Sequence, residues 1–351
     1  MNQRYGTYSV NQIAQALNLS RSTVSKVLNG RPGVSEKTYN LIMNYIHAAD
    51  KQPDNPSAGN ASGQMPTIMF SYCLENIEYI NGLLAGIEEA LKNNGYLLAV
   101  NIVTRNSGEG NYLPPSVYSG SVKGIISFNI YDLAYWEEVC ALPVPSVFLD
   151  TIYDKHRFSG KTDIILPENE APLMEAITAL AREGRRNFGF LGYPYFCYSL
   201  YQRWETYRNT LKNLGLPLNE ENCILDDFDQ MPDIDMAQAL KNRLIQMKNL
   251  PDAYICTSDK QAIQLLRALK ELSVCVPQDV AVIGFDNLPE SLRQDPPLST
   301  VDAYSSVQGS LAVTALLDRI AHPDRPHITI QCQTKLLLRE SSGHSTRIGG
   351  E

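Results

Sequence analysis

The chain has 351 residues, of which 44% are hydrophobic and 19% charged, with a net charge of −8. This composition is typical of a globular protein and argues against collagen, a coiled coil or a wholly disordered chain. No apolar run approaches the roughly 20 residues of a transmembrane helix, and the N-terminus lacks the pattern of a secretory signal, so a cytoplasmic protein is expected. At roughly 150 residues per domain, the length favours two or three domains.

Seven cysteines are scattered along the chain without a Cys-x-x-Cys pair or a histidine at metal-ligand spacing. This pattern predicts reduced thiols that are mostly buried, and neither a metal site nor a cofactor.

The charge is unevenly divided along the chain. Residues 1–50 carry five basic and two acidic residues, a balance of +3, whereas the remaining residues carry −11. A small basic region before a large acidic body favours a polyanionic partner for the first region alone.

Residues 1–51 show the pattern of three short helices. Apolar residues spaced three and four apart predict a helix over about 10–17, with Ser9 as its N-cap. Ser20 precedes a second predicted helix, which ends at Asn29. A third apolar pattern after Ser35 would close a small all-α helix-turn-helix domain.

The second predicted helix has a polar face that suits DNA. Arg21 and Lys26 can donate hydrogen bonds to guanine in a major groove, and Ser22 and Ser25 share that face. A solvated helix face is the alternative interpretation. The helix-turn-helix pattern at the basic end of an acidic chain favours DNA.

The segment YSVNQIAQALNLSRSTVSKVLNGRPGVSEKT, residues 8–38, resembles the DNA-binding head of the lac repressor family. The resemblance implies that three residues of the second helix reach base edges and that four others contact phosphates or the DNA backbone. The residues that would reach base edges are Arg21, Ser22 and Lys26. Those that would contact phosphates or the DNA backbone are Ser20, Thr23, Ser25 and Asn29.

Residues 52–66 are rich in proline and glycine and predict a flexible linker. In the family this region normally forms a hinge helix of the Ala-Arg-x-Leu kind, which inserts a leucine into the minor groove. The expected Arg and Leu positions here are Ala58 and Asn60. Operator affinity is therefore expected to rest on the heads and on dimerisation, with weak binding or an unusual operator spacing as the alternative.

From residue 67 onwards, short apolar runs alternate with helical patterns of about 10 to 15 residues, which predicts β-α-β units and parallel sheets. A body of this length favours two doubly wound α/β lobes with a ligand cleft between them. Ligands in such sheets bind beyond the carboxyl ends of the strands.

Polar residues follow three of the predicted strands, namely Asp150, Ser258 and Asp286. Carboxylates and hydroxyls at converging strand ends can bind a polyhydroxylated ligand, and the rings of Tyr79, Phe128 or Trp204 could stack on it. Each aspartate could instead cap a helix or form a turn.

The body also resembles the core of the lac repressor family and of periplasmic binding proteins, in stretches such as RALKELSVCVPQDVAVIGFDNLP and LLLRESS. The resemblance implies that Arg203 clamps the ligand and that Asp286 accepts hydrogen bonds from it. Ser258 and Thr206 depart from the residues that the family has at these positions, which leaves the ligand open. Asp259 could equally be a cap or a contact.

The same resemblance implies that residues 67–340 form a core for effector binding and dimerisation. Residues 67–162 and 291–320 would form lobe one, and residues 163–290 and 321–340 lobe two, with three crossings between them. The polar end of the chain, 341–351, is expected to be a frayed tail.

Together these features predict a DNA-binding transcriptional regulator, a repressor that binds a palindromic operator as a homodimer, with a tetramer left open. A sugar is the first choice of effector, and a nucleobase or another metabolite the second. A solute-binding module without operator specificity is the alternative, but it would need a secretory signal. No catalytic motif favours an enzyme.

Overall fold

The computed structural model describes residues 4–5, 8–9, 14, 19–28, 34, 38, 42, 65–73, 77–103, 112–154, 156–228 and 231–344. The chain forms two compact units, Met1–Gln64 and Met65–Glu351. Within the described residues, no helix is long and apolar enough to span a membrane.

In the first unit, helix α2 (Arg21–Leu28) occupies the range of the second predicted helix. Ser20 caps it, since the Ser20 hydroxyl accepts a hydrogen bond from the Thr23 N–H at 3.1 Å. Val24 and Val27 are buried against Ala14 and Ile42, which are themselves helical and lie in the first and third predicted helices. Thr38 of the third predicted helix is also helical, and the rest of those two helices lies outside the described residues.

The first unit is not entirely helical. Strands β1 (Arg4–Tyr5) and β2 (Tyr8–Ser9) form a short antiparallel pair that the all-α prediction did not include. Two residues per strand are too few to show the alternation of apolar and polar residues by which a strand is recognised in a sequence.

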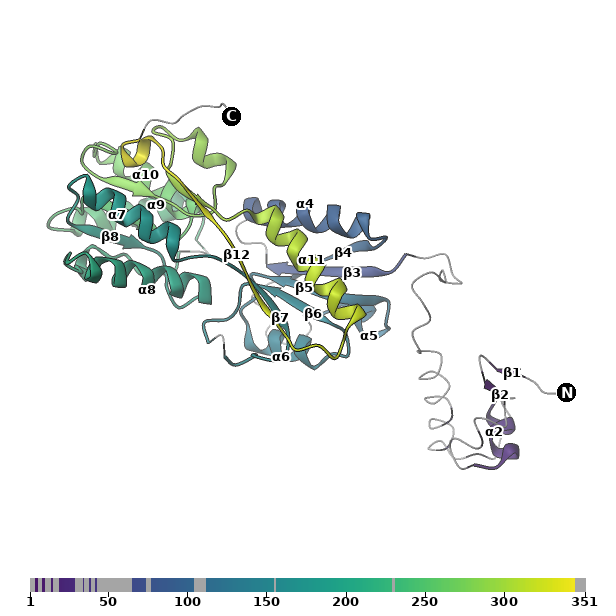
Figure 1. Cartoon of the computed structure of the whole chain (residues 1–351). Helices are drawn as coiled ribbons and strands as arrows, with labels where there is room; N and C mark the ends of the chain where they lie inside the picture. The colour runs from purple at the N-terminus through teal and green to yellow at the C-terminus, as the bar shows by residue number, and fades with distance from the viewer. Residues whose placement is uncertain are drawn as a thin grey trace. The chain divides into compact units, whose positions relative to one another are not determined.

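Lobe one of the second unit is built on a six-stranded parallel sheet with the order β12-β7-β6-β5-β3-β4 (Figure 1). Helices α4 (Ile77–Asn93) and α11 (Ser305–Ala321) cover one face, where they pack on Ile68 and Phe70. Helices α5 (Pro115–Tyr118) and α6 (Leu133–Ala141) cover the other face. The strands are β3 (Thr67–Cys73), β4 (Leu97–Val103), β5 (Val122–Phe128), β6 (Ser146–Leu149), β7 (Asp163–Pro167) and β12 (Thr329–Cys332).

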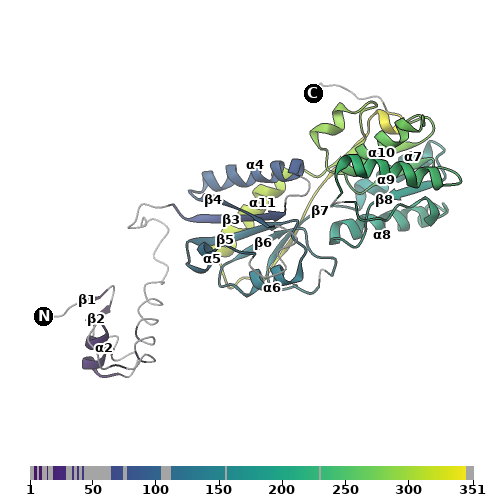
Figure 2. The same cartoon turned by 180° about the vertical axis from the view of Figure 1, so that it is seen from behind.

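Lobe two has a parallel sheet of β8 (Phe188–Leu191), β9 (Ala253–Cys256) and β10 (Ala281–Ile283). Helices α7 (Ala171–Arg182) and α8 (Tyr198–Asn213) pack on one face of it, and α9 (Asp233–Gln246) and α10 (Asp259–Glu271) on the other (Figure 2). Helices on both faces confirm the prediction of two doubly wound α/β lobes. The remaining elements are the antiparallel pair β11 (Thr300–Asp302) and β13 (Lys335–Leu337), and the 3-10 helices η1 (Glu220–Asn222), η2 (Pro289–Arg293) and η3 (Glu340–Ser342).

Strands β7 and β12 were predicted in lobe two, and this is wrong. Strand β7 pairs with β6, and β12 pairs with β7, so both belong to the sheet of lobe one. The buried Asp163 at the start of β7 holds them there, because its carboxylate accepts hydrogen bonds from Arg319 of α11 at 2.9 and 3.1 Å and from the Ile328 N–H at 2.8 Å. The crossings between the lobes therefore lie later, after Pro167 and after Cys332.

The predicted tail begins too early. Ser341 and Ser342 are buried, and the Ser341 hydroxyl donates a hydrogen bond to the Val282 carbonyl of β10 at 2.6 Å. Residues 341–344 thus belong to lobe two, and residues 345–351 lie outside the described residues.

The seven cysteines, all among the described residues, form no disulfide bond with one another; five are buried, Cys140 is half-buried and Cys275 is exposed. No group of three or more His, Cys, Asp or Glu side chains in the described part of the chain could hold a metal ion.

Candidate functional site

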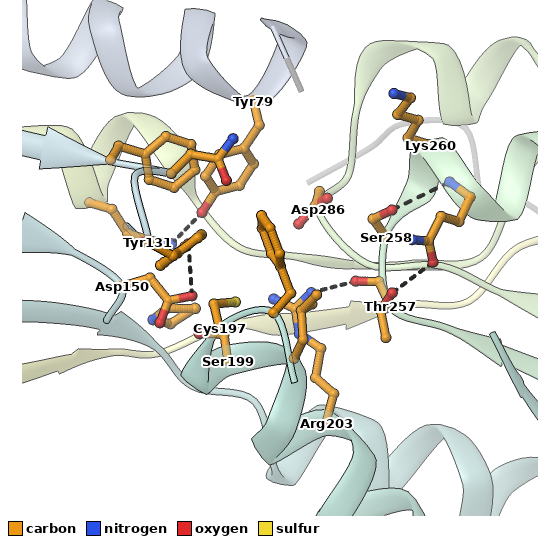
Figure 3. Close-up of a pocket in the computed structure, with 17 residues that line it drawn as sticks. Tyr79, Tyr131, Asp150, Cys197, Ser199, Arg203, Thr257, Ser258, Lys260 and Asp286 are labelled. Atoms are coloured by element: carbon orange, nitrogen blue, oxygen red, sulfur yellow. Dashed lines mark hydrogen bonds between the residues drawn. The ribbon is translucent and has the colours of Figure 1, made fainter. Parts of the chain in front are cut away.

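A pocket lies between the two lobes, beyond the carboxyl ends of strands from both sheets (Figure 3). Lobe one contributes residues that follow β5 and β6 and the start of α4, and lobe two contributes the starts of α8 and α10. The structure brings all six predicted effector-binding residues to this pocket: Tyr79, Phe128, Asp150, Arg203, Ser258 and Asp286.

Three pocket residues that follow strands have a left-handed backbone. Asn129 follows β5 with φ 58°, Asp150 follows β6 with φ 66°, and Asp286 follows β10 with φ 117°. This conformation is uncommon for residues other than glycine, and Asn and Asp adopt it most readily. Each strand therefore ends in a sharp turn whose polar side chain lines the pocket.

Asp150 is a buried carboxylate on the lobe-one side of the pocket. Its Oδ1 accepts a hydrogen bond from the Thr151 N–H at 2.6 Å, and the Tyr131 hydroxyl donates to its Oδ2 at 3.5 Å. Burial raises the pKa of Asp150, although the Thr151 N–H and the charge of Arg203 act in the opposite direction. Asp150 precedes no helix, so here the helix-cap alternative is wrong.

Arg203 is a buried cation that enters the pocket from α8 (Figure 3). Its Nε donates to the Asn169 Oδ1 at 2.9 Å, and its Nη1 donates to the Thr257 carbonyl. The guanidinium lies over the Phe285 ring, 3.4 Å from the ring centroid. These contacts fix the orientation of Arg203, so a ligand would meet a preorganised donor.

Aromatic rings form the apolar part of the pocket. Tyr79 stacks on Phe128 with ring centroids 5.4 Å apart, and Tyr131 meets Phe196 edge to face at 4.9 Å. The Tyr79 hydroxyl accepts a hydrogen bond from the Gln308 amide at 3.0 Å, and burial raises the pKa of Tyr79.

Trp204 does not line the pocket, although its ring was considered for ligand stacking. It lies in the core of lobe two, where its ring is 5.0 Å from Phe190 and 5.6 Å from Tyr207. Trp204 follows Arg203 on α8, but its side chain packs against the sheet of lobe two and not toward the pocket.

The start of α10 supplies the polar part of lobe two. The Ser258 hydroxyl caps this helix by accepting from the Gln261 N–H at 3.3 Å, and the Thr257 hydroxyl donates to the Gln261 side chain at 2.8 Å. Lys260 lies at the pocket with its Nζ 3.8 Å from Asp233. Asp259 is not the cap of α10, because Ser258 occupies that position. Its side chain is fully buried and does not line the pocket.

Several lining residues were not predicted from the sequence. Asn129 follows a predicted strand and could have been found by the rule that selected Asp150. Gln308 lies on a helix far along the chain, and no local pattern indicates that it reaches the pocket. The other missed residues are Tyr131, Pro167, Phe196, Cys197, Ser199, Leu200, Thr257, Lys260 and Gln261.

In the head, α2 presents Arg21, Ser22 and Lys26 to solvent, with Ser20 exposed before it. Thr23 and Ser25 are half-buried, and the Ser20 hydroxyl lies 2.8 Å from both the Ser22 and the Thr23 hydroxyls. Asn29 lies outside the described residues. The exposed face is therefore polar and basic, opposite the apolar face formed by Val24 and Val27.

The chain is similar to bacterial regulators over nearly its whole length. Residues 177–342 match a periplasmic binding protein-like domain. The chain is 24% identical over 336 residues to the ribose operon repressor of Haemophilus influenzae, covering 95% of this chain and 98% of the relative. It is 27% identical to the HTH-type transcriptional regulator MalR of Streptomyces coelicolor, covering 94% and 95%.

Solved structures share the fold. A CelR–cellobiose complex superposes with a TM-score of 0.70 at 21% sequence identity. The lac repressor dimer bound to operator and an anti-inducer superposes with a TM-score of 0.66 at 20% sequence identity. Each match covers 95% of this chain and 99% of the other chain.

Proposed function

Because this chain belongs to the lac repressor family of transcriptional regulators, we propose that it is a repressor whose affinity for its operator is controlled by a sugar bound between the two lobes. The chain is a regulator and not an enzyme. The observation that carries the proposal is the pocket that joins two carboxylates, a buried arginine and aromatic rings.

The chemistry of the pocket supports a sugar. A sugar hydroxyl can donate to Asp150 or Asp286 and accept from Arg203, and the apolar face of the ring can pack on Tyr79 or Phe128. Among the relatives, CelR was solved with cellobiose, and a regulator from Enterococcus faecium with ribose. A nucleobase is the second candidate, since stacked aromatic rings also suit a planar ligand.

The exposed polar face of α2 supports binding in a DNA major groove, with Arg21, Ser22 and Lys26 toward the bases. We propose that Ser20, Thr23, Ser25 and Asn29 contact the DNA backbone. One such head makes few contacts, so a homodimer on a palindromic operator in the cytoplasm is the geometry that we propose. Because the linker lacks the hinge-helix residues, affinity would rest on the two heads and on dimerisation.

The DNA part of the proposal is tested by selecting fragments of host DNA on the immobilised protein at several salt concentrations. We expect a palindromic site, and we expect Arg21→Ala or Lys26→Ala to relax or abolish its selection. Lys270→Ala, which removes an exposed lysine of the body, is the control and should select the same site. Unchanged base preference in both head variants would contradict the recognition helix.

The effector part is tested with ribose, glucose, galactose, cellobiose, maltose and adenine. We expect one of the sugars to change operator affinity and to give a saturable heat of binding. If adenine binds and none of the sugars does, the proposed effector is a nucleobase and not a sugar. If neither class binds, the proposal of a sugar or nucleobase effector fails.

A further inference from the structure

Asp286 and Asn287 are consecutive residues with positive φ, 117° and 52°. Two such residues in succession are strained for side chains other than glycine. Neighbouring groups must therefore hold this turn, and the groups that do so lie outside the pocket.

Asp259 holds the turn from the start of α10. It is fully buried; its Oδ2 accepts a hydrogen bond from the Leu288 N–H at 2.8 Å, and its Oδ1 accepts from the Thr300 hydroxyl at 2.6 Å. Gly284 makes room for it, because a Cβ there would lie 2.1 Å from the Asp259 carboxylate. Burial and the nearby charge of Asp286 raise the pKa of Asp259, and the hydrogen bonds from Thr300 and Leu288 act in the opposite direction.

Thr300 links Asp259 to the strained residues. While its hydroxyl donates to Asp259, it accepts a hydrogen bond from the Asn287 N–H at 3.2 Å. The Val301 carbonyl, on the same strand β11, accepts a hydrogen bond from the Asp286 N–H at 2.8 Å. Thr300 is fully buried, so no water can replace its hydroxyl without a rearrangement.

Arg339, which follows β13, holds the Asn287 side chain. Its Nη2 donates to the Asn287 Oδ1 at 2.7 Å, and its Nη1 donates to the Ser291 hydroxyl at 2.8 Å and to the Leu298 carbonyl at 2.7 Å. The Asn287 amide in turn donates to Asp302 at 3.0 Å. The turn is therefore fixed by residues from three separate segments of the chain.

We propose that Asp259, Thr300 and Arg339 are positioning residues for effector recognition, which hold Asp286 in the left-handed conformation that presents its carboxylate to the pocket. The inference rests on the proposed function for the role of Asp286 as a ligand contact. It assigns the selectivity of the pocket partly to a buried network that no ligand touches.

The test is Thr300→Val in the full chain, which keeps the shape of the side chain and removes the hydroxyl. Hydrogen exchange at the Asn287 and Leu288 amides should become at least about tenfold faster. The Asn287 N–H loses its acceptor, the Thr300 hydroxyl, and the Leu288 N–H keeps Asp259 as acceptor but without the Thr300 hydrogen bond that orients that carboxylate. Thr300→Ser should restore the protection. Thr162→Val, which removes another buried hydroxyl in lobe one, is the matched control and should leave these amides unchanged.

The second measurement is calorimetric affinity for whichever panel sugar binds the wild type. Thr300→Val should weaken binding about tenfold, and the loss should disappear in an Asp286→Asn background because both changes act through the same carboxylate. An equal loss in both backgrounds, or unchanged exchange at residues 287 and 288, would overturn the inference. If no sugar binds the wild type, the proposed function fails, whereas the exchange measurement still decides whether Thr300 fixes the turn.

Discussion

The two lobes offer different chemistry to the ligand. Lobe one contributes the rings of Tyr79, Phe128 and Tyr131 together with the carboxylate of Asp150, whereas lobe two contributes the donors of Arg203 and Lys260 and the hydroxyls at the start of α10. Lobe two also contributes the carboxylate of Asp286 and the ring of Phe196, so both lobes present an acceptor and an aromatic face, whereas the cations among the described lining residues come from lobe two.

This difference implies that a polar ligand must touch both lobes to satisfy its groups, so binding depends on how closely the lobes approach. Contacts between the lobes already exist beside the pocket: Tyr131 meets Phe196 at 4.9 Å, and Tyr153 meets Tyr201 at 4.8 Å. A ligand that bridges the lobes would add to these contacts and shift the lobe angle.

The largest expected effect is on the lobe-two side. Arg203→Ala should weaken binding of the effector about 100-fold, because a preorganised charged donor is lost from a buried site. Isothermal calorimetry measures the affinity, and operator binding without effector should persist. Arg208→Ala is the matched control, since it removes an exposed arginine from the same helix. Unchanged affinity in a folded Arg203→Ala protein would contradict the assignment of the pocket.

The strand-end rule explains why much of the pocket was predictable. Parallel strands end at the same edge of a sheet, so Ser258 and Asp286 of lobe two could be expected to converge without knowledge of the strand order. Asp150 lies at the corresponding edge of the lobe-one sheet, and a cleft between two such lobes brings the two edges together. The resemblance to the family added Arg203. Lining residues such as Phe196 and Gln308 belong to a loop and to a distant helix, whose approach depends on tertiary packing that no local periodicity encodes.

The lobe boundaries could not be predicted for a related reason. After Asp163, the run IILP of β7 is apolar, as a central strand of either sheet would be. Its place is decided by Asp163 with Arg319 and Arg325, a contact between residues more than 150 positions apart. A local sequence pattern gives the type of an element but not the sheet to which it belongs.

A smaller effect is expected for Asp150→Asn on the lobe-one side. Affinity should fall about tenfold, because a charged acceptor becomes a neutral one. Since burial raises the pKa of Asp150 in the folded protein, the ionised carboxylate destabilises the ligand-free fold at neutral pH, and this penalty is lost as the pH falls through that raised pKa.

The variant should therefore unfold at a higher temperature than the wild type at pH 7. The gap should narrow as the pH falls toward the unfolded value of about 3.9. Calorimetric unfolding across this pH range measures it, and a lower unfolding temperature for the variant at pH 7 would contradict the prediction.

The smallest effect is expected for the stacked rings of Tyr79 and Phe128 in the pocket. Phe128→Leu keeps an apolar side chain but loses the ring that stacks on Tyr79 at 5.4 Å. Stacking of a ligand face on the Phe128 ring would contribute about 0.5 to 1.5 kcal/mol beyond burial, so loss of the ring should lower affinity about 2- to 13-fold. Phe158→Leu, in the core of the same lobe beside Trp136, should lower the unfolding temperature and leave affinity unchanged. If both variants weaken binding equally, the effect would come from the stability of lobe one, and the aromatic faces would have no direct part in holding the ligand.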